Sequence, residues 1–439
     1  MAVPGLPYIP VRVKFVLCLV VATTWMVLSI WVSQPWFAEL GRHIGTVLAV
    51  FIITFIAIVP GFMNAFLMAA LALDRRPRVP PRDEHPGITV LVAAYNEAGS
   101  IEDTVRSILR QDYPGPLQVI VINDGSKDNT ADIVRGLLPE DPRLELIDVQ
   151  PNGGKAAALN QGLKACRHDL VITVDGDCWL WHRALRNLVG RMLADPPDTR
   201  AVAGSILIRN SRENWLTRTQ EWDYFLGIAA IKRVQSLFQG TLVAQGAFSI
   251  YDRKTVEAVG GWPETVGEDI VLTWRILEAG WRVGHAENAV AFTRCPATLK
   301  QFIRQRQRWS RGLIEAFKIS PGIMLQPRMP VFYIWWNTLF PLMDLAYTIG
   351  FIPGVVLALF GHYWIVGPMT LALIPVSILM NQLMYQRSKT TFDELGLRVR
   401  RNRLGLITYA AVYSMILQPA CVWGYISEIL NLRKTWGTK

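Results

Sequence analysis

Two carboxylates separated by one glycine, Asp175 and Asp177, give this sequence its strongest local signal for chemistry. They follow a short apolar run, and Gly176 between them would permit a sharp turn after a strand. In an extended chain, side chains two residues apart point to the same side. Carboxylate oxygens suit Mg²⁺ or Mn²⁺, and such an ion would bridge diphosphate oxygens and neutralise a leaving group. The alternative is an ordinary Asp-Gly turn.

Two further polar groups follow other apolar runs. The carboxylate of Asp124 would accept from a nucleobase or ribose or support a metal indirectly, unless it simply caps a helix. The segment from Asn152 to Lys155 reads N-G-G-K, and a lysine at such a helix start can hold a phosphate. It is not a P-loop, because Val149 replaces the first glycine and Ala156 the Ser/Thr. The alternative is a helix entry with a solvated lysine.

Two later segments carry charged and aromatic side chains at helical spacing. Glu268 and Asp269 open a helix predicted to continue over 270–277, where Asp269 would act as a general base. The alternative is a pair of acidic residues matched to the helix dipole. Gln305, Arg308 and Trp309 would share one helix face, with a guanidinium for a diphosphate and an indole for a sugar ring. The alternative is a basic amphipathic helix on a membrane surface.

Alternating apolar runs and helical segments must position these groups. Runs at 88–94, 118–122, 144–149 and 170–174 predict buried strands, and an S-x-x-D sequence at Ser100 predicts a capped helix between the first two. This alternation of strands and helices predicts a mostly parallel sheet with ligands at the carboxyl ends of its strands. Tyr95, Glu97 and Asp124 fall at those ends, as does the Asp175–Asp177 pair.

Composition indicates a membrane protein. The chain is 51% hydrophobic and 18% charged, against roughly 25% charged in a soluble domain. Its net charge of +10 fits basic clusters at the ends of membrane spans better than nucleic-acid binding. The five cysteines form no CxxC pair or zinc-ligand spacing and suit a reducing compartment. The apolar runs predicted to span a bilayer lie at 15–32, 46–73, 331–360, 363–385 and 405–430.

Basic residues predict the orientation of these spans. The first run lacks a small-residue cleavage site, so a retained span is expected rather than a signal peptide. Arginines after the second run place the following block in the cytoplasm, and the basic loop at 387–403 is expected there too. Five spans would put the tail outside, which its own basic residues oppose. The arginines after the second run and the basic residues of the tail are Arg75, Arg76, Arg78, Arg82, Arg433, Lys434 and Lys439.

In their order and spacing, these side chains resemble the processive family 2 membrane glycosyltransferases, which include synthases of cellulose, chitin, hyaluronan and poly-N-acetylglucosamine. Two spans before the polar block, three runs after it and Asp-Gly-Asp rather than Asp-Ser-Asp make the chain most similar to bacterial poly-β-1,6-N-acetylglucosamine synthases. Gly267 departs from the Thr that many members have before the acidic pair. The positions that match the family pattern are Asp124, Asp175, Asp177, Glu268, Asp269, Gln305, Arg308 and Trp309.

The resemblance implies two N-terminal spans (1–75), a cytoplasmic, Rossmann-like α/β domain of the GT-A fold (76–320) with interfacial helices toward its end, and about three C-terminal spans (321–439). It implies inverting transfer from a UDP-sugar with Mg²⁺ or Mn²⁺. Asp269 would be the catalytic base, Asp177 the metal ligand, and Trp309 the platform for the acceptor sugar. The residues expected to bind substrate are Tyr95, Glu97, Asp124, Lys155, Asp175, Glu268, Gln305, Arg308 and Trp309.

The implied activity is polymerisation of UDP-N-acetylglucosamine onto a growing polysaccharide and its translocation across a bacterial inner membrane. The similarity also suggests a small membrane subunit and cyclic di-GMP control; nucleic acid is not an expected partner. A chitin, hyaluronan or β-glucan synthase, a single-transfer glycolipid glycosyltransferase and a degenerate nucleotide-sugar-binding subunit are the alternatives, the last opposed by the complete set of carboxylates. Residues of the late spans that would line a polymer path, unless they only pack helices, are Trp335, Trp336, Asn337, Asp344, Tyr347, Asn381 and Gln382.

Overall fold

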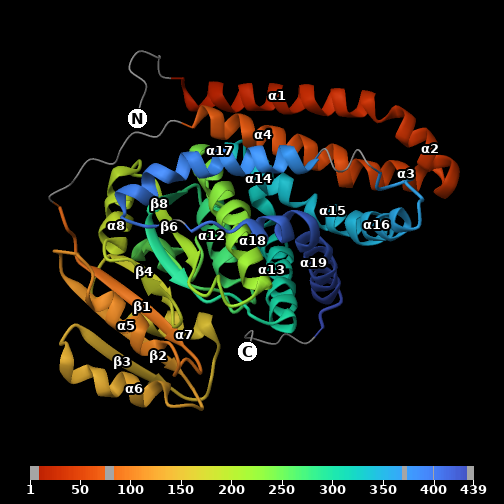
Figure 1. The fold of residues 1–439 in the computed structure, drawn as a ribbon. Helices are drawn as coiled ribbons and strands as arrows, with labels where there is room; N and C mark the ends of the chain where they lie inside the picture. The colour runs from red at the N-terminus through yellow and green to blue at the C-terminus, as the bar shows by residue number, and fades with distance from the viewer. Residues whose placement is uncertain (1–8, 75–83, 368–372, 399, 433–439) are drawn as a thin grey trace.

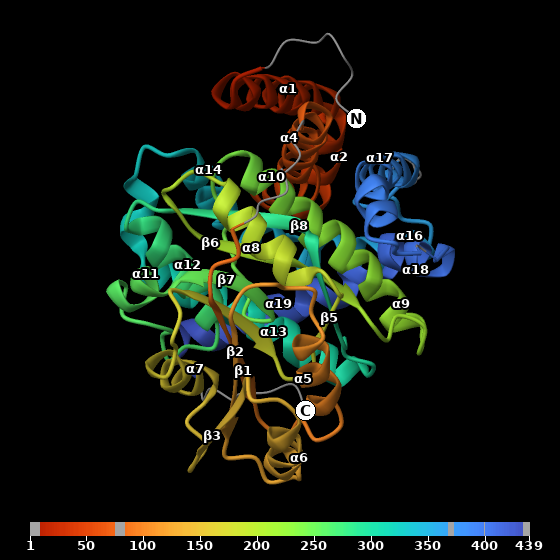
Figure 2. The same cartoon turned by 90° about the vertical axis from the view of Figure 1, so that its left-hand side faces the viewer.

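The computed structural model describes residues 9–74, 84–367, 373–398 and 400–432. Along the sequence, an α/β domain stands between two groups of apolar helices, as the sequence analysis predicts. In space, α1 to α4 run along the top of the view in Figure 1, and the strands lie below them. The arginines at 75–82 and the basic residues at 433–439, on which the predicted orientation depends, lie outside the described residues. The first three strands, β1 to β3, lie at the end of the molecule away from helices α1 and α4 (Figures 1 and 2).

One eight-stranded sheet forms the centre of the α/β domain, in the order β3-β2-β1-β4-β7-β6-β8-β5. Its first four strands in sequence coincide with the predicted runs, and the neighbouring pairs among them are parallel. Their carboxyl ends therefore meet at one edge. The strands are β1 (Ile88–Ala94), β2 (Leu117–Asp124), β3 (Leu144–Val149), β4 (Leu170–Asp175), β5 (Trp179–Leu180), β6 (Thr199–Ile208), β7 (Phe248–Asp252) and β8 (Arg282–Thr293).

The other half of the sheet is mixed, so the sheet is less parallel than the sequence analysis expected. β7 is antiparallel to both β4 and β6, β6 is parallel to β8, and β5 is antiparallel to β8. Phe248, which opens β7, lies opposite Val174 near the end of β4. The helical segments α9 (Trp215–Trp222), η3 (Asp223–Ala230) and α10 (Ile231–Leu237) thus return the chain to the carboxyl edge, and β7 runs back from there.

Helices bury both faces of the sheet. Along β1 and β2, alternate residues enter opposite cores, so that Val90 and Val119 belong to one core, and Leu91 and Ile120 to the other. This explains the continuous apolar runs of these strands. One core takes side chains from α5 (Ile101–Leu109), α6 (Thr130–Leu137) and α8 (Ala184–Ala194). The other takes them from α7 (Lys155–Lys164), α10, α12 (Glu268–Glu278) and α13 (Leu299–Ile319). The short helix α11 (Arg253–Ala258) follows β7.

Among the described residues, four helices are long and apolar enough to cross a membrane. They are Val11–Val32, Thr46–Leu73, Met329–Leu359 and Arg403–Ile429, close to four of the five predicted runs. Many large apolar side chains on them are exposed, as expected of surfaces that face lipid. The remaining run, 363–385, is partly outside the described residues, and its later part belongs to α17 (Leu373–Glu394).

These long helices consist of shorter elements. The first is α1 (Val11–Val32), and the short helix α2 (Gln34–Ile44) connects it to the second. The second contains α3 (Thr46–Ile53), η1 (Thr54–Ile58) and α4 (Val59–Leu73), and α4 packs along α1 (Figure 1). The third contains α14 (Met329–Asn337), α15 (Phe340–Ala346), η5 (Tyr347–Phe351) and α16 (Ile352–Leu359). The fourth contains α18 (Arg403–Thr408), η7 (Tyr409–Tyr413) and α19 (Ser414–Ile429), and α19 packs along α13. Helix α13 therefore touches both the α/β domain and the apolar helices.

Candidate active site

Lys155 lies at the centre of the predicted catalytic groups. Its Nζ is 2.6 Å from Asp175 Oδ1 at the end of β4 and 3.1 Å from Glu268 Oε1 at the start of α12. Burial opposes the charged form of Lys155, but the neighbouring carboxylates outweigh it and raise its pKa above the usual range. Lys155 thus joins two separate stretches of chain, and the solvated lysine of the alternative interpretation is not observed.

The two acidic residues that open α12 have different surroundings. Glu268 is buried, and burial raises its pKa, an effect that Lys155 opposes. Asp269 is half-buried; its Oδ1 accepts from its neighbour Ile270 N at 2.8 Å and its Oδ2 from Gly246 N at 3.3 Å. The second bond ties Asp269 to the loop before β7.

Gly246 is a site residue that sequence reasoning missed. A Cβ atom at this position would lie 2.5 Å from Lys155 Nζ, so a side chain here would displace the lysine. The Gln-Gly pair before β7 looks like any turn in the sequence. Only the approach of α7 to this loop reveals the need for glycine.

Asp175 and Asp177 contact different neighbours. β4 ends at Asp175 and the chain turns at residues 176–177, so the alternation expected of a strand stops before Asp177. While Asp175 pairs with Lys155, Asp177 Oδ1 accepts from Thr293 Oγ1 at 3.3 Å, at the end of β8. The glycine between them serves close packing rather than a left-handed turn, because an added Cβ would lie 3.1 Å from Glu97 Cγ.

Asp124 is buried beneath the glycine turn that precedes α7. Its Oδ1 accepts from Gly153 N at 2.8 Å, and its Oδ2 accepts from Gly154 N at 2.8 Å and from Asn152 Nδ2 at 2.9 Å. It therefore fixes the segment that carries Lys155. Asp124 does not cap the helix after β2, which was the alternative interpretation: the N-cap residue of α6 is Asn129, and Asp128 before it accepts from Thr130 N at 3.1 Å.

The loop after β1 carries Tyr95 and Glu97, both half-buried. Glu97 N donates to Thr130 Oγ1 at 2.8 Å, so this loop is joined to the start of α6. The expected cap by Ser100 is not made; its hydroxyl donates instead to Glu97 Oε2 at 2.8 Å.

The Q-x-x-R-W residues lie on α13, as predicted. Gln305 is buried, and its Oε1 has no hydrogen-bond partner within the described part of the chain. Burial raises the pKa of Glu268, and the charge of Arg308 is one of those that oppose this rise, which places the guanidinium near the acidic start of α12. Trp309 is 39% exposed, so part of the indole is open to a ligand.

A pair of glycines explains how α13 reaches this site. A Cβ at Gly267 would lie 2.6 Å from the Cα of Gly312, and Gly267 N donates to Glu315 Oε2 at 2.9 Å. The backbones of α12 and α13 are therefore in direct contact. Sequence reasoning noted Gly267 but missed Gly312 and Glu315, whose importance depends on this contact.

The acidic side chains would hold a metal ion only together with oxygen atoms from a bound ligand. In the ranges that the structure describes, no three His, Cys, Asp or Glu side chains gather closely enough to hold an ion by themselves. Asp177 nevertheless presents a half-buried carboxylate at a strand end, next to the Thr293 hydroxyl. Such a donor set fits Mg²⁺ or Mn²⁺ completed by diphosphate oxygens and water.

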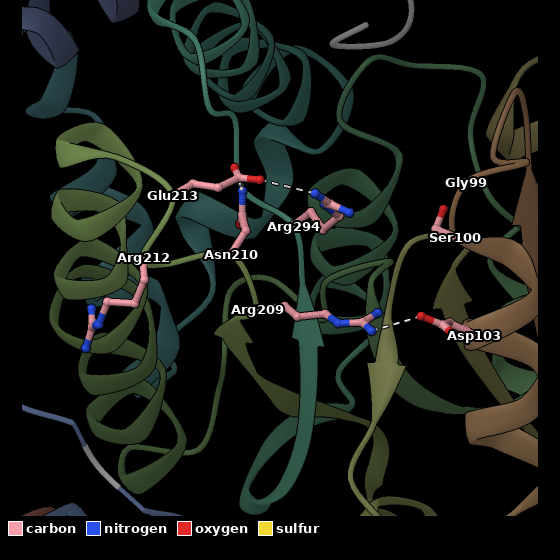
Figure 3. A pocket seen from close by; sticks show the side chains of 8 residues that line it. All are labelled: Gly99, Ser100, Asp103, Arg209, Asn210, Arg212, Glu213 and Arg294. Carbon is pink, nitrogen blue, oxygen red and sulfur yellow. Dashed lines mark hydrogen bonds and ion pairs between the residues drawn. The ribbon is translucent and has the colours of Figure 1, made fainter.

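A polar cavity of about 440 Å³ opens beside the site, between the start of α5 and the ends of β6 and β8 (Figure 3). Arg209 and Asp103 pair across it at 2.8 Å, and Arg294 pairs with Glu213 at 3.3 Å. Arg294 follows Thr293, so the cavity adjoins the Asp177 side of the site. None of the predicted site residues lines it.

Comparison with solved structures identifies the class of fold. The mannosyltransferase PcManGT from Pyrobaculum calidifontis, solved in complex with GDP-Man and Mn²⁺, matches with a TM-score of 0.61. The match covers 88% of this chain and 100% of that chain at 21% identity. The α/β domain has the GT-A fold of glycosyltransferases.

Sequence comparison finds a family match within the chain. Residues 89–260 match the family described as glycosyl transferase family 2. It is 35% identical over 242 residues to the poly-beta-1,6-N-acetyl-D-glucosamine synthase of Staphylococcus aureus, covering 55% of this chain and 58% of that protein. It is 32% identical over 238 residues to an N-acetylglucosaminyltransferase of Rhizobium meliloti, covering 52% and 55%. The chain thus spans little more than half the length of the curated relatives it matches.

Proposed function

We propose that this protein is an inverting, processive glycosyltransferase that polymerises a UDP-sugar, with UDP-N-acetylglucosamine as donor and poly-β-1,6-N-acetylglucosamine as product. The observation that carries the proposal is the meeting of Lys155, Asp175 and Glu268 beside Asp269. These residues come from three separate stretches and gather at the edge where α/β sheets bind ligands. The names of the two relatives support the choice of sugar.

In the proposed reaction, the carboxylate of Asp269 accepts the proton of an acceptor hydroxyl. The hydroxyl oxygen bonds to the anomeric carbon as the bond from that carbon to UDP breaks, with inversion. Gly246 N and the α12 amide of Ile270 hold the carboxylate in place. Trp309 stacks on the acceptor sugar, and Arg308 faces the diphosphate.

The donor would lie along the loops after β1, β2 and β4. Tyr95 and Glu97 border the nucleotide, and Asp124 supports this region by holding the turn before Lys155. Asp177 would hold a Mg²⁺ or Mn²⁺ ion, which, when bound, would neutralise charge on the departing UDP. The structure of the mannosyltransferase PcManGT, which was solved with Mn²⁺, supports the choice of a divalent ion.

The four apolar helices support a multi-pass membrane protein. We propose that its catalytic domain lies on the cytoplasmic side of a bacterial inner membrane, between spans in 1–75 and 321–439. The growing polysaccharide would cross the bilayer past the late helices. There Tyr425 donates to Asp344 Oδ2 at 2.9 Å, a buried polar pair in an apolar setting. A small membrane subunit and cyclic di-GMP control belong to the proposal only through the family likeness.

The test is to incubate membranes containing the protein with each radiolabelled UDP-sugar and Mg²⁺ or Mn²⁺. UDP-N-acetylglucosamine should give a polymer that a β-1,6-specific N-acetylglucosaminidase degrades, whereas membranes with Asp269→Asn should not. Label in a single-sugar glycolipid would identify a single-transfer enzyme instead. A polymer resistant to that enzyme but cut by a chitinase would overturn the proposed linkage.

A further inference from the structure

A second arginine on α13, Arg306, is buried although the Q-x-x-R-W pattern does not require it. Arg306 is 4% exposed, and its Nη2 lies 2.8 Å from Oδ2 of Asp223, itself 7% exposed. Among the residues described, Arg306 Nε, Arg306 Nη2 and Asp223 Oδ2 make no hydrogen bond, so the two side chains form an ion pair without hydrogen-bond geometry. A buried ion pair adds little stability compared with apolar packing, so its presence calls for another explanation.

The guanidinium of Arg306 lies against Trp309. Its Cζ is 4.0 Å from the centroid of the Trp309 ring, within the range of a cation–π interaction. The same carbon is 4.9 Å from the ring of Phe302 and 5.9 Å from that of Tyr413. Arg306 therefore lies over the indole ring, and 39% of Trp309 remains exposed outside this contact.

The counter-ion comes from an unusual segment. Asp223 opens η3, a π-helical stretch of eight residues that continues α9. The other π-helical stretches of the described residues, η1, η5 and η7, belong to the apolar helices, whereas η3 belongs to the α/β domain. Gly227 gives the carboxylate room, since an added Cβ would lie 2.7 Å from Asp223 Oδ1. Tyr224, the next residue, has its ring centroid 6.3 Å from that of Trp309.

We propose that Arg306 is a positioning residue, held by Asp223, that fixes the Trp309 ring so that a single face receives the acceptor sugar. This rests on the proposed function, in which Trp309 binds the acceptor. Arg306 acts through the indole and does not touch the sugar. Because Tyr413 belongs to the apolar helix Arg403–Ile429, the same contact relates the acceptor platform to that helix.

The test compares Arg306→Lys with wild type in two assays that use the UDP-sugar found to label polymer. Lysine keeps the charge but lacks the planar group that stacks on Trp309. We expect transfer to short oligosaccharide acceptors to fall about tenfold through a higher KM, while UDP release by hydrolysis without acceptor stays within about twofold. Asp223→Asn should shift the same ratio. Arg304→Lys, on the exposed side of α13, should match wild type.

Equal loss of transfer and hydrolysis, or no loss at all, would overturn the positioning role. If Arg306→Lys does not fold, as judged by UDP binding and melting temperature, the transfer-to-hydrolysis ratio of Asp223→Asn decides. An unchanged ratio in that variant also overturns the inference. Wild-type protein that makes no polymer from any UDP-sugar would instead reject the proposed function.

Discussion

At the scale of single residues, the site depends on carboxylates whose charges are balanced locally. Lys155 balances Asp175 and Glu268, and Asp124 is satisfied by backbone amides. Asp269 is half-buried and bonds to two backbone amides. Of these acidic residues it is therefore the one best placed to exchange a proton with a substrate.

Replacing Asp269 by Asn should separate catalysis from folding. The amide keeps the shape of the side chain but cannot accept a proton, so we expect polymerisation to fall by about 10²-fold or more. UDP binding and melting temperature should stay near those of wild type. Asp132→Asn, a change at an exposed site on α6, is the matched control. Turnover near wild type in the Asp269 variant would reject its role as base.

Lys232 on α10 predicts how stability depends on pH. Burial lowers its pKa to about 7, although the charge of Asp269 partly offsets this. Between pH 7 and its unfolded pKa of roughly 10.4, the unfolded chain binds a proton that the folded protein does not, so stability rises with pH. Below about pH 7 both states are protonated, and the folded state retains the full cost of burying the charge.

We therefore expect Lys232→Met to remove about 2 kcal/mol of the increase in unfolding free energy between pH 7 and 9. Melting temperatures of purified protein in detergent at pH 7, 8 and 9 would measure this. Lys254→Met, at an exposed position, should leave the wild-type slope unchanged. The same slope in the Lys232 variant as in wild type would show that this lysine stays charged throughout.

At the scale of elements, the sequence predicts strands better than their assembly. The buried runs of β1 to β4 were found because a strand covered on both faces must be apolar throughout. The antiparallel β7 and the contact between Gly267 and Gly312 were not found, because both depend on helices that return from distant parts of the chain. Motif order predicted the site residues, and the structure brings Lys155, Asp175 and Glu268 together, but the partners Gly246 and Arg306 follow from packing alone.

The contact between α12 and α13 should not tolerate the threonine that many members of the resembled family have at residue 267. In this chain an added Cβ would lie 2.6 Å from Gly312 Cα, which is backbone and cannot rotate away. We expect Gly267→Thr to destabilise the protein by about 1–3 kcal/mol and to lower activity with it. Gly136→Ala, where a Cβ would meet nothing, is the control. Unchanged melting temperature and turnover would mean that α13 can shift freely.

At the scale of the whole molecule, an ion cluster joins the apolar helices to the catalytic domain. Asp74, at the end of α4, pairs with Arg233 on α10, which also pairs with Glu287 on β8. The side chain of Asp74 is 1% exposed, so its charge lies away from water, beside this arginine. The second apolar helix is therefore connected to the sheet by ion pairs as well as by the covalent chain.

Removing Arg233 should loosen this connection. Arg233→Met would leave the carboxylate of Asp74 buried without its arginine, which we expect to cost about 3–5 kcal/mol. Arg135→Met removes an arginine with two pairs on exposed α6 and should cost at most about 1 kcal/mol. Melting temperatures in lipid nanodiscs would compare the two variants. Similar, small losses for both would mean that the junction contributes little and that the apolar helices and the catalytic domain are stabilised separately.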